Sequence, residues 1–214
     1  MQNQNDPETR SRHLRITEPS PWVRRFAPLA PDGGLVLDLA AGNGRHGRYF
    51  LDRGHPIVAV DRDVSTLADL AAAPGAEIIE ADLETGGPVF DGKGPLAGRT
   101  FAAIVAVNYL YRPLMEGLIG ALEPGGVLIY ETFARGNEQF QKPRNPDHLL
   151  EQGELLRLCE GRLQVVAYEH GLVDAAEIPG VKQRISAVND LSESDRDDGE
   201  PQPHPTNPAT TPGD

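Results

Sequence analysis

The sequence predicts an α/β domain built on a doubly wound, mostly parallel β-sheet. Short apolar runs alternate along the chain with amphipathic stretches, and glycine and proline separate them. Several apolar runs contain no polar residue, which is typical of strands that helices cover on both faces. Repeated strand–helix–strand units of this kind form parallel sheets.

Seven apolar runs are predicted to be strands, and four amphipathic stretches are predicted to be helices. The strands are expected at Leu35–Leu39, Ile57–Val60, Glu77–Glu80, Phe101–Val107, Gly126–Thr132, Leu163–Tyr168 and Gln183–Val188. The helices are expected at Arg45–Arg53, Val64–Ala73, Leu110–Leu122 and Gly153–Cys159. Pro124-Gly125-Gly126 is predicted to be a helix stop and a turn. Because only the short stretch 169–180 joins the last two strands, we expect them to pair antiparallel.

The 214 residues suffice for one domain with flanking segments. We predict a polar N-terminal segment at 1–19, the domain at 20–189 and a tail at 190–214. The tail carries seven carboxylates against Arg196 alone, so its net charge of −6 is half of the total of −12. It also has five prolines from Pro201 to Pro212. Such a composition buries too little apolar surface to offset the entropy of ordering, so disorder is predicted from about residue 191.

Composition excludes several classes of protein. The acidic balance disfavours binding to duplex nucleic acid, which depends on clustered Lys and Arg. The single cysteine, Cys159, leaves no internal disulfide and no Cys-based zinc site, and the six histidines show no metal-ligand spacing. No apolar signal core appears in residues 1–20, and the run Phe101–Val107 is too short to cross a bilayer. We therefore expect a cytoplasmic protein with no membrane span and no metal.

A glycine-rich turn follows the first predicted strand. Gly42, Gly44 and Gly47 form the pattern G-x-G-x-x-G between a strand and a helix, which lets the backbone approach a ligand closely. The pattern alone also fits a dinucleotide. Asp38 lies inside the first strand, where a carboxylate would oppose a pyrophosphate but suits a cationic amino-acid group. Asp61 ends the second strand, where a carboxylate accepts hydrogen bonds from ribose hydroxyls.

Asp82, after the third strand, completes a set of three acids at three consecutive strands. With Asp38 and Asp61 it describes S-adenosylmethionine better than NAD, because a carboxylate there can accept from an adenine amino group.

The segment 36–44, Val-Leu-Asp-Leu-Ala-Ala-Gly-Asn-Gly, resembles motif I of class I S-adenosylmethionine-dependent methyltransferases. The segments 58–61 and 81–83 fall where that family contacts ribose and adenine. The resemblance implies a seven-stranded Rossmann-like sheet with the last strand antiparallel, and S-adenosylmethionine as cofactor with S-adenosylhomocysteine as product. It implies ten cofactor-binding residues: Asp38, Ala40, Gly42, Asn43, Gly44, Asp61, Arg62, Asp82, Leu83 and Asn108.

The acceptor site is expected beyond the fourth and fifth strands. Nucleic-acid amino-methyltransferases of this fold carry two prolines after the residue equivalent to Asn108, and both are absent here, so a small-molecule acceptor is favoured. Residues 131–138 are loosely similar to tellurite-resistance-type methyltransferases. We expect Glu131 and Tyr109 to be catalytic, and four residues to bind substrate: Tyr111, Arg112, Asn137 and Glu138. Trp22, before the first strand, either forms a lid or packs on the sheet.

Two alternatives stay open. An NAD-dependent oxidoreductase would use the same glycine turn, although the sequence contains no Tyr-x-x-x-Lys pair. A non-catalytic module would keep the fold and bind a partner. The oligomeric state is not predicted.

Overall fold

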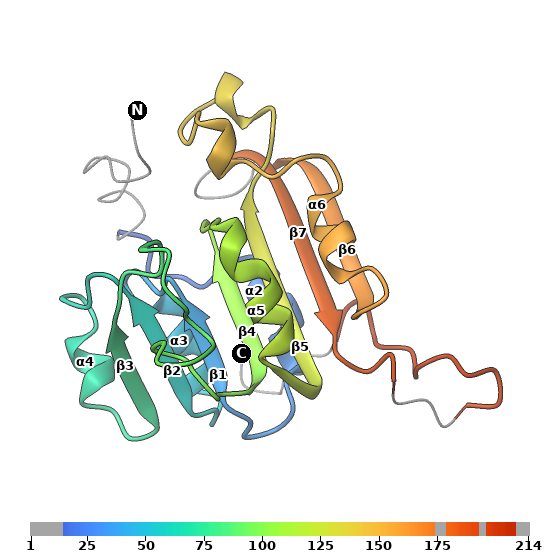
Figure 1. Cartoon of the computed structure of the whole chain (residues 1–214), viewed down its shortest axis with the longest axis horizontal. Coiled ribbons are helices and arrows are strands. Elements are labelled where there is room, and N and C mark those ends of the chain that lie inside the picture. The colour runs from blue at the N-terminus through green and yellow to red at the C-terminus, as the bar shows by residue number, and fades with distance from the viewer. Residues whose placement is uncertain (1–14, 174–178, 193–195, 209–214) are drawn as a thin grey trace.

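The computed structural model describes residues 15–173, 179–192 and 196–208 (Figure 1). Within these ranges seven strands form one sheet in the order β3-β2-β1-β4-β5-β7-β6. The first five strands run parallel, β7 is antiparallel to β5, and β6 is antiparallel to β7. The strands are β1 (Val36–Leu39), β2 (Ile57–Asp61), β3 (Ala76–Glu80), β4 (Phe101–Val107), β5 (Leu122–Phe133), β6 (Gln164–Val173) and β7 (Gly180–Val188). The predicted fold class and the reversed last strand are confirmed.

Helices cover the two faces of this sheet. Helices α5 (Met115–Gly120) and α6 (Glu154–Cys159) pack on one face, and α2 (Pro21–Phe26), α3 (Arg45–Leu51) and α4 (Ala68–Ala71) pack on the other (Figure 1). Alternate residues of β4 enter the two cores, since Ile104 faces α5 and Val105 faces α2. This two-sided burial explains why β4 reads as an unbroken apolar run. Four short 3-10 helices complete the described elements: η1 (Ala27–Leu29), η2 (Arg112–Leu114), η3 (Asn137–Gln139) and η4 (Pro146–His148).

Several predicted boundaries are wrong by three or more residues. The helix predicted at Val64–Ala73 is α4 at Ala68–Ala71, and β6 and β7 extend to Val173 and Gly180, beyond the predicted Tyr168 and Gln183. Pro124-Gly125-Gly126 was predicted to be a turn but lies inside β5, which already begins at Leu122. The register jumps there, from Phe101 opposite Leu122 to Ala103 opposite Val127, so the extra residues form a bulge. The helix predicted over Leu110–Leu122 is η2 followed by the short helix α5.

The described part of the C-terminal tail contacts the domain. Arg25 of α2 donates to the carbonyl of Thr206 at 3.0 and 2.7 Å, and within the tail Nε2 of His204 lies 2.7 Å from Oδ2 of Asp190. Pro201 and Pro208 are buried. The sequence predicted disorder from about residue 191. These tail contacts are made by residues within 196–208, and residues 193–195 and 209–214 lie outside the described residues. No helix in the described ranges is long and apolar enough to span a bilayer.

Candidate active site

The glycine-rich turn joins β1 to α3. Gly42 and Gly44 have φ values of 58° and 74°, and Ala40 has a φ of 54°, so three of these residues lie in the left-handed region. A Cβ on Gly44 would lie 2.6 Å from side-chain carbons of Leu67 and Leu70. Glycine is therefore required at Gly44 for its backbone conformation and for space. The turn begins helix α3, whose first N–H groups point toward the end of the sheet.

Asp38 of β1 contacts helix α3, which follows this turn. Its side chain is buried, and Oδ2 accepts a hydrogen bond from the backbone N–H of Gly47 at 2.8 Å. Nδ1 of His46 lies 3.9 Å from the other oxygen. Burial raises the pKa of Asp38 to about 7, while the bond from Gly47 opposes that rise. A cationic partner would stabilise the ionised form of this carboxyl group.

Asp61 ties the end of β2 to the same turn. Its Oδ2 accepts from the backbone N–H of Gly42 at 2.8 Å, and its Oδ1 accepts from the N–H of Asp63 at 3.0 Å. Each carboxylate oxygen accepts more than one hydrogen bond, so capacity remains for a ligand. The structure thus brings together the two acids that the sequence placed on separate strands.

The predicted residues after β2 and β3 lie in different surroundings. Leu83 is buried, whereas Arg62 is exposed. Asp82 accepts a hydrogen bond from the backbone N–H of Glu84 at 2.9 Å, which shapes the loop after β3. Burial raises the pKa of Tyr109, and the charges of Glu84 and Asp82 add to the rise. The charges of these two acids therefore disfavour ionisation of the Tyr109 hydroxyl.

That hydroxyl is buried and has no hydrogen-bond partner within the described ranges. It was predicted to be catalytic beside Glu131, and among the described residues it makes no hydrogen bond to Glu131. A buried donor without a partner is costly, so a ligand that accepts from Tyr109 would relieve this cost.

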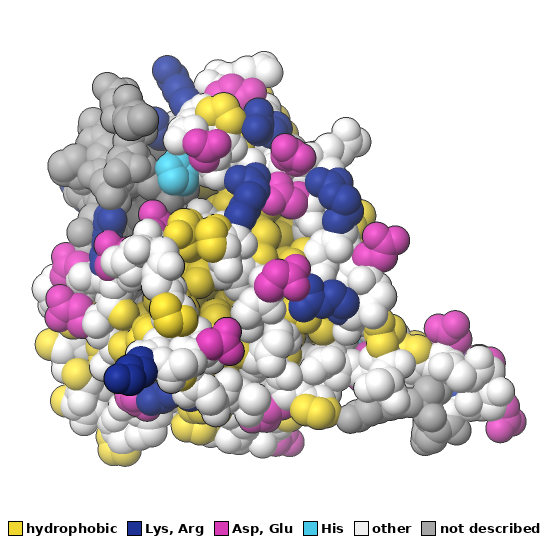
Figure 2. Space-filling view, viewed as in Figure 1, with side chains coloured by type: hydrophobic (Ala, Val, Ile, Leu, Met, Phe, Trp, Pro, Cys, Tyr) yellow, Lys and Arg dark blue, Asp and Glu magenta, His cyan; other side chains and the backbone are white. Residues whose placement is uncertain are grey.

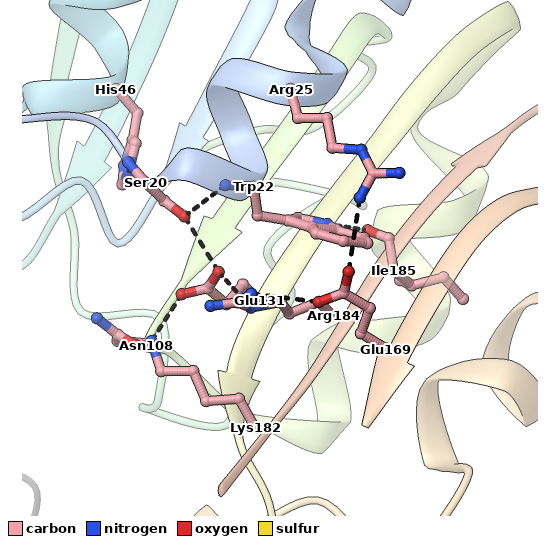
Figure 3. Close-up of polar contacts among 10 residues, drawn as sticks. All are labelled: Ser20, Trp22, Arg25, His46, Asn108, Glu131, Glu169, Lys182, Arg184 and Ile185. Atoms are coloured by element: carbon pink, nitrogen blue, oxygen red, sulfur yellow. Dashed lines mark hydrogen bonds and ion pairs between the residues drawn. The ribbon is translucent and has the colours of Figure 1, made fainter. Parts of the chain in front are cut away.

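Asn108 and Glu131 meet at the carboxyl ends of β4 and β5. The backbone N–H of Asn108 donates to the carbonyl of Glu131 at 2.8 Å, and Asn108 has a φ of 57°. Nζ of Lys182, near the start of β7, donates to Oδ1 of Asn108 at 3.0 Å and to Oε1 of Glu131 at 2.6 Å (Figure 3). The antiparallel register, with Phe133 opposite Lys182, places this lysine at the same end of the sheet.

The second oxygen of Glu131 binds two further residues. Oε2 accepts from the hydroxyl of Ser20 at 3.0 Å and lies 2.9 Å from Nε of Arg184 (Figure 3). Burial alone raises the pKa of Glu131, but the charges of Lys182 and Arg184, with the hydrogen bonds from Lys182 and Ser20, lower it below its usual range. Glu131 is therefore an ionised anchor with both oxygens engaged.

Residues 16–20 cross over the glycine-rich turn. The side chain of Asn43 donates to the carbonyl of Ile16 at 2.7 Å, and Arg45 donates to the carbonyl of Glu18 at 2.8 Å. The N–H of Ser20 donates to Nε2 of His46 at 3.2 Å. Burial, followed by the charges of Arg45 and Lys182, lowers the pKa of His46, so the imidazole is neutral and accepts this bond.

Trp22 packs on the sheet, which answers the choice that the sequence left open. Its side chain is 2% exposed, its indole N–H donates to the carbonyl of Ile185 at 3.1 Å, and its ring lies 4.6 Å from that of Phe26. The short helix α2 is thereby fixed over β7, and the segment before it is held above the site.

The predicted substrate residues are dispersed. Arg112 pairs with both oxygens of Glu154 at 2.7 and 2.9 Å and donates to the carbonyls of Asp147 and Leu149. Asn137 is fully buried and holds the following loop by donating to the carbonyls of Gln141 and Pro143. Both side chains therefore hold loops through these contacts. Tyr111 is half-buried beside the α5 core, and Glu138 is exposed and accepts from the N–H of Gly136.

Three residues of the site were missed in the sequence: Ser20, Lys182 and Arg184. Lys182 and Arg184 are alternate residues of β7, so one face of this strand carries two cations. This pattern could have marked them. Their partner Glu131 lies 51 residues earlier in the chain, and only the sheet order brings them together. No group of three or more metal-ligating side chains occurs in the part of the chain that the structure describes.

The sheet order and the reversed β7 define the fold of class I S-adenosylmethionine-dependent methyltransferases. No protein-family model and no curated protein sequence matches the chain. Solved structures do match. TehB from Haemophilus influenzae superposes with a TM-score of 0.63 at 14% identity, over 85% of this chain and 66% of TehB.

Two further solved structures share the fold. A 1,6-didemethyltoxoflavin-N1-methyltransferase from Burkholderia thailandensis, with S-adenosylhomocysteine bound, gives a TM-score of 0.57 at 19% identity, over 83% of this chain and 78% of that chain. A TehB-like methyltransferase from Corynebacterium glutamicum gives 0.53 at 19% identity, over 85% and 95%. At these identities the likeness establishes the fold.

Proposed function

We propose that the protein is an S-adenosylmethionine-dependent methyltransferase that acts on a small-molecule acceptor. The observation that carries this proposal is the pair of carboxylates Asp38 and Asp61, which bond to the backbone of the glycine turn and of the helix after it, with Asp82 following the neighbouring strand β3. Ligands of open α/β sheets bind beyond the carboxyl ends of the strands. The Burkholderia enzyme, which has the same fold, binds S-adenosylhomocysteine.

The residues present fit this cofactor. Gly42 and Gly44 have the left-handed backbone of a tight glycine turn, and such a turn lets the backbone lie close to a ligand at the helix N-terminus. Asp38 suits the ammonium group of the cofactor, Asp61 its ribose, and Asp82 with Leu83 its adenine. Asn108 borders the reacting centre. The cofactor supplies an electrophilic methyl group on a sulfonium.

The chain's own residues act mainly by alignment and by exclusion of water. Residues 16–20 cover the turn through bonds to Asn43, Arg45 and His46. Glu131 holds Ser20 and Lys182 in place, so we assign it a positioning role rather than that of a base. Tyr109 is assigned to the adenine side, where its hydroxyl would find a partner.

The NAD alternative is disfavoured by the sheet. The dinucleotide fold has the strand order 3-2-1-4-5-6 with all strands parallel, whereas this sheet inserts an antiparallel β7 between β5 and β6. Nucleic acid is also not the proposed acceptor. On the face shown in Figure 2, Lys and Arg side chains alternate with Asp and Glu and form no continuous basic surface.

Calorimetric titration with S-adenosylhomocysteine tests the proposal. We expect saturable binding, weakened at least about tenfold by Asp61→Ala because the ribose loses a charged partner. Asp91→Ala, on an exposed loop, is the matched control and leaves the affinity unchanged. Since Asp61 also holds Gly42, thermal melting of each variant separates loss of the partner from loss of the fold. No binding at millimolar ligand would refute the proposal.

A further inference from the structure

The ammonium of Lys182 has one N–H donor that no described residue accepts from. Its side chain is 3% exposed, and its ammonium donates to Asn108 and to Glu131. An ammonium has three N–H donors. Among the described residues only these two acceptors bind it, so one buried donor remains for a ligand at the ends of β4 and β5.

Asn108 offers a second donor at the same place. Because Lys182 occupies its Oδ1, the amide is oriented with its NH2 group away from the lysine. The left-handed backbone at Asn108 turns this side chain out of the β4 ladder. A ligand in contact with both residues therefore meets donors and must itself accept.

The charges around Glu131 leave an excess of one positive charge. Three cations, Lys182, Arg184 and Arg25, pair with two carboxylates, Glu131 and Glu169 (Figure 3). The two oxygens of Glu131 are both bound, and the Nε2 lone pair of His46 is bound by Ser20. These groups can hold an anion, and the pairing of Glu131 with two cations makes its carboxylate a weak base.

Buried apolar side chains lie beside the ammonium. Ile16 packs against Phe133 and Leu149 in a small cluster separate from the two main cores. Nζ of Lys182 lies 5.1 Å from the centre of the Phe133 ring. These side chains keep water away from the ammonium, and a small, strongly hydrated oxyanion loses more on leaving water than an organic carboxylate does.

From these contacts we propose that the acceptor is a small organic acid, and that its carboxylate is the group methylated. This inference rests on the proposed methyltransferase function. Lys182 and Asn108 bind one carboxylate oxygen. The other oxygen forms the new bond to the methyl carbon as the carbon–sulfur bond breaks and its electron pair goes to sulfur. No proton moves, and the product is a methyl ester.

The weak basicity of Glu131 fits this reaction. A phenol or a protonated amine must lose a proton before or during attack, but a carboxylate is ionised at neutral pH. The attack also joins an anion to a sulfonium and yields two neutral groups. A site from which water is excluded favours such neutralisation.

Binding of benzoate to protein saturated with S-adenosylhomocysteine gives the first test. We expect benzoate to bind and benzamide, its neutral counterpart, to bind at least about tenfold more weakly. Lys182→Met should weaken benzoate binding by a similar factor, and Lys182→Arg should restore part of it. Lys93→Met, on an exposed loop, should change nothing. The benzamide comparison uses the unaltered protein, so it stands even where Lys182→Met does not fold.

Transfer of a radiolabelled methyl group gives the second test. Benzoate, phenylacetate and octanoate should each yield label that mild alkali releases as volatile methanol, which is the signature of a methyl ester. Protein that binds S-adenosylhomocysteine but labels none of these acids, or methylates only selenite or tellurite, would overturn this inference and leave the proposed function standing. Failure to bind S-adenosylhomocysteine would overturn both.

Discussion

The hydroxyl of Ser20 donates a hydrogen bond of 3.0 Å to Oε2 of Glu131, which lies 111 residues later in the chain. Ser20 also begins helix α2, since its side chain accepts from the N–H of Trp22 at 3.2 Å. One buried serine therefore joins the segment over the glycine turn to the end of β5. The positions of the site residues depend on this junction.

Ser20→Ala should lower the free energy of unfolding by about 2–3 kcal/mol, because it removes a helix cap and a hydrogen bond to a buried carboxylate. Urea denaturation followed by the fluorescence of Trp22, the only tryptophan, measures this. Asn145→Ala removes a cap from the exposed η4 and should cost about 1 kcal/mol or less. Equal losses in the two variants would show that the bond from Ser20 to Glu131 contributes nothing.

Glu131→Gln should destabilise the fold by about 3 kcal/mol, because two cations then lose their shared buried carboxylate. Glu169→Gln is the matched control: its side chain is 48% exposed, and its loss should cost less than about 1 kcal/mol. Denaturant titration of both variants checks the difference. A Glu131→Gln protein with unchanged stability but no methyl transfer would instead identify Glu131 as a base.

The sequence predicted best the strands that helices cover on both faces. β4 was predicted at its observed bounds, because helices cover both of its faces and no polar residue interrupts it. The start of β5 was missed because Pro124 and Gly125 are turn residues in most contexts, and only pairing with β4 keeps them in the strand.

The sequence predicted the site residues that lie close together in the chain, and it missed those that only long-range contacts bring together. Asp38 and Gly44 lie within one strand and its turn, and the sequence identified them. Lys182 is positioned by antiparallel pairing of β7 with β5, a long-range contact that no local pattern encodes. The same holds for Arg112, which pairs with Glu154, 42 residues later in the chain, and thereby holds a loop in place.

Gly44→Ala should cost about 1–2 kcal/mol more than Gly54→Ala. Both glycines have a positive φ, 74° and 84°, so both variants carry the left-handed strain of alanine. Only at Gly44 would the new Cβ also meet Leu67 and Leu70, each at 2.6 Å, whereas nothing lies within 4 Å at Gly54. Thermal or urea unfolding of the two variants measures the difference, and equal stability would mean that the leucines yield without cost.

Asp38 should make cofactor binding depend on pH. Burial raises its pKa to about 7, so at pH 6 most of the folded protein carries a neutral carboxyl group. If the ammonium of the ligand binds this group, it binds the ionised form. The affinity for S-adenosylhomocysteine should therefore rise by up to about tenfold between pH 6 and pH 7.5. Calorimetry at pH 6 in buffers of different ionisation enthalpy should detect a released proton.

Asp38→Asn is the control, because an amide oxygen can still accept from the N–H of Gly47 but does not titrate. Its affinity should be lower and independent of pH in this range.

The free energy of unfolding should change with pH in the opposite direction to the affinity. The folded state holds the proton of Asp38 up to about pH 7, while the unfolded chain releases it near its ordinary pKa. The contribution of Asp38 to the free energy of unfolding therefore falls as pH rises between these two values. Binding that weakens from pH 6 to pH 7.5 would contradict this assignment, since an acid with a raised pKa can only gain negative charge across that range.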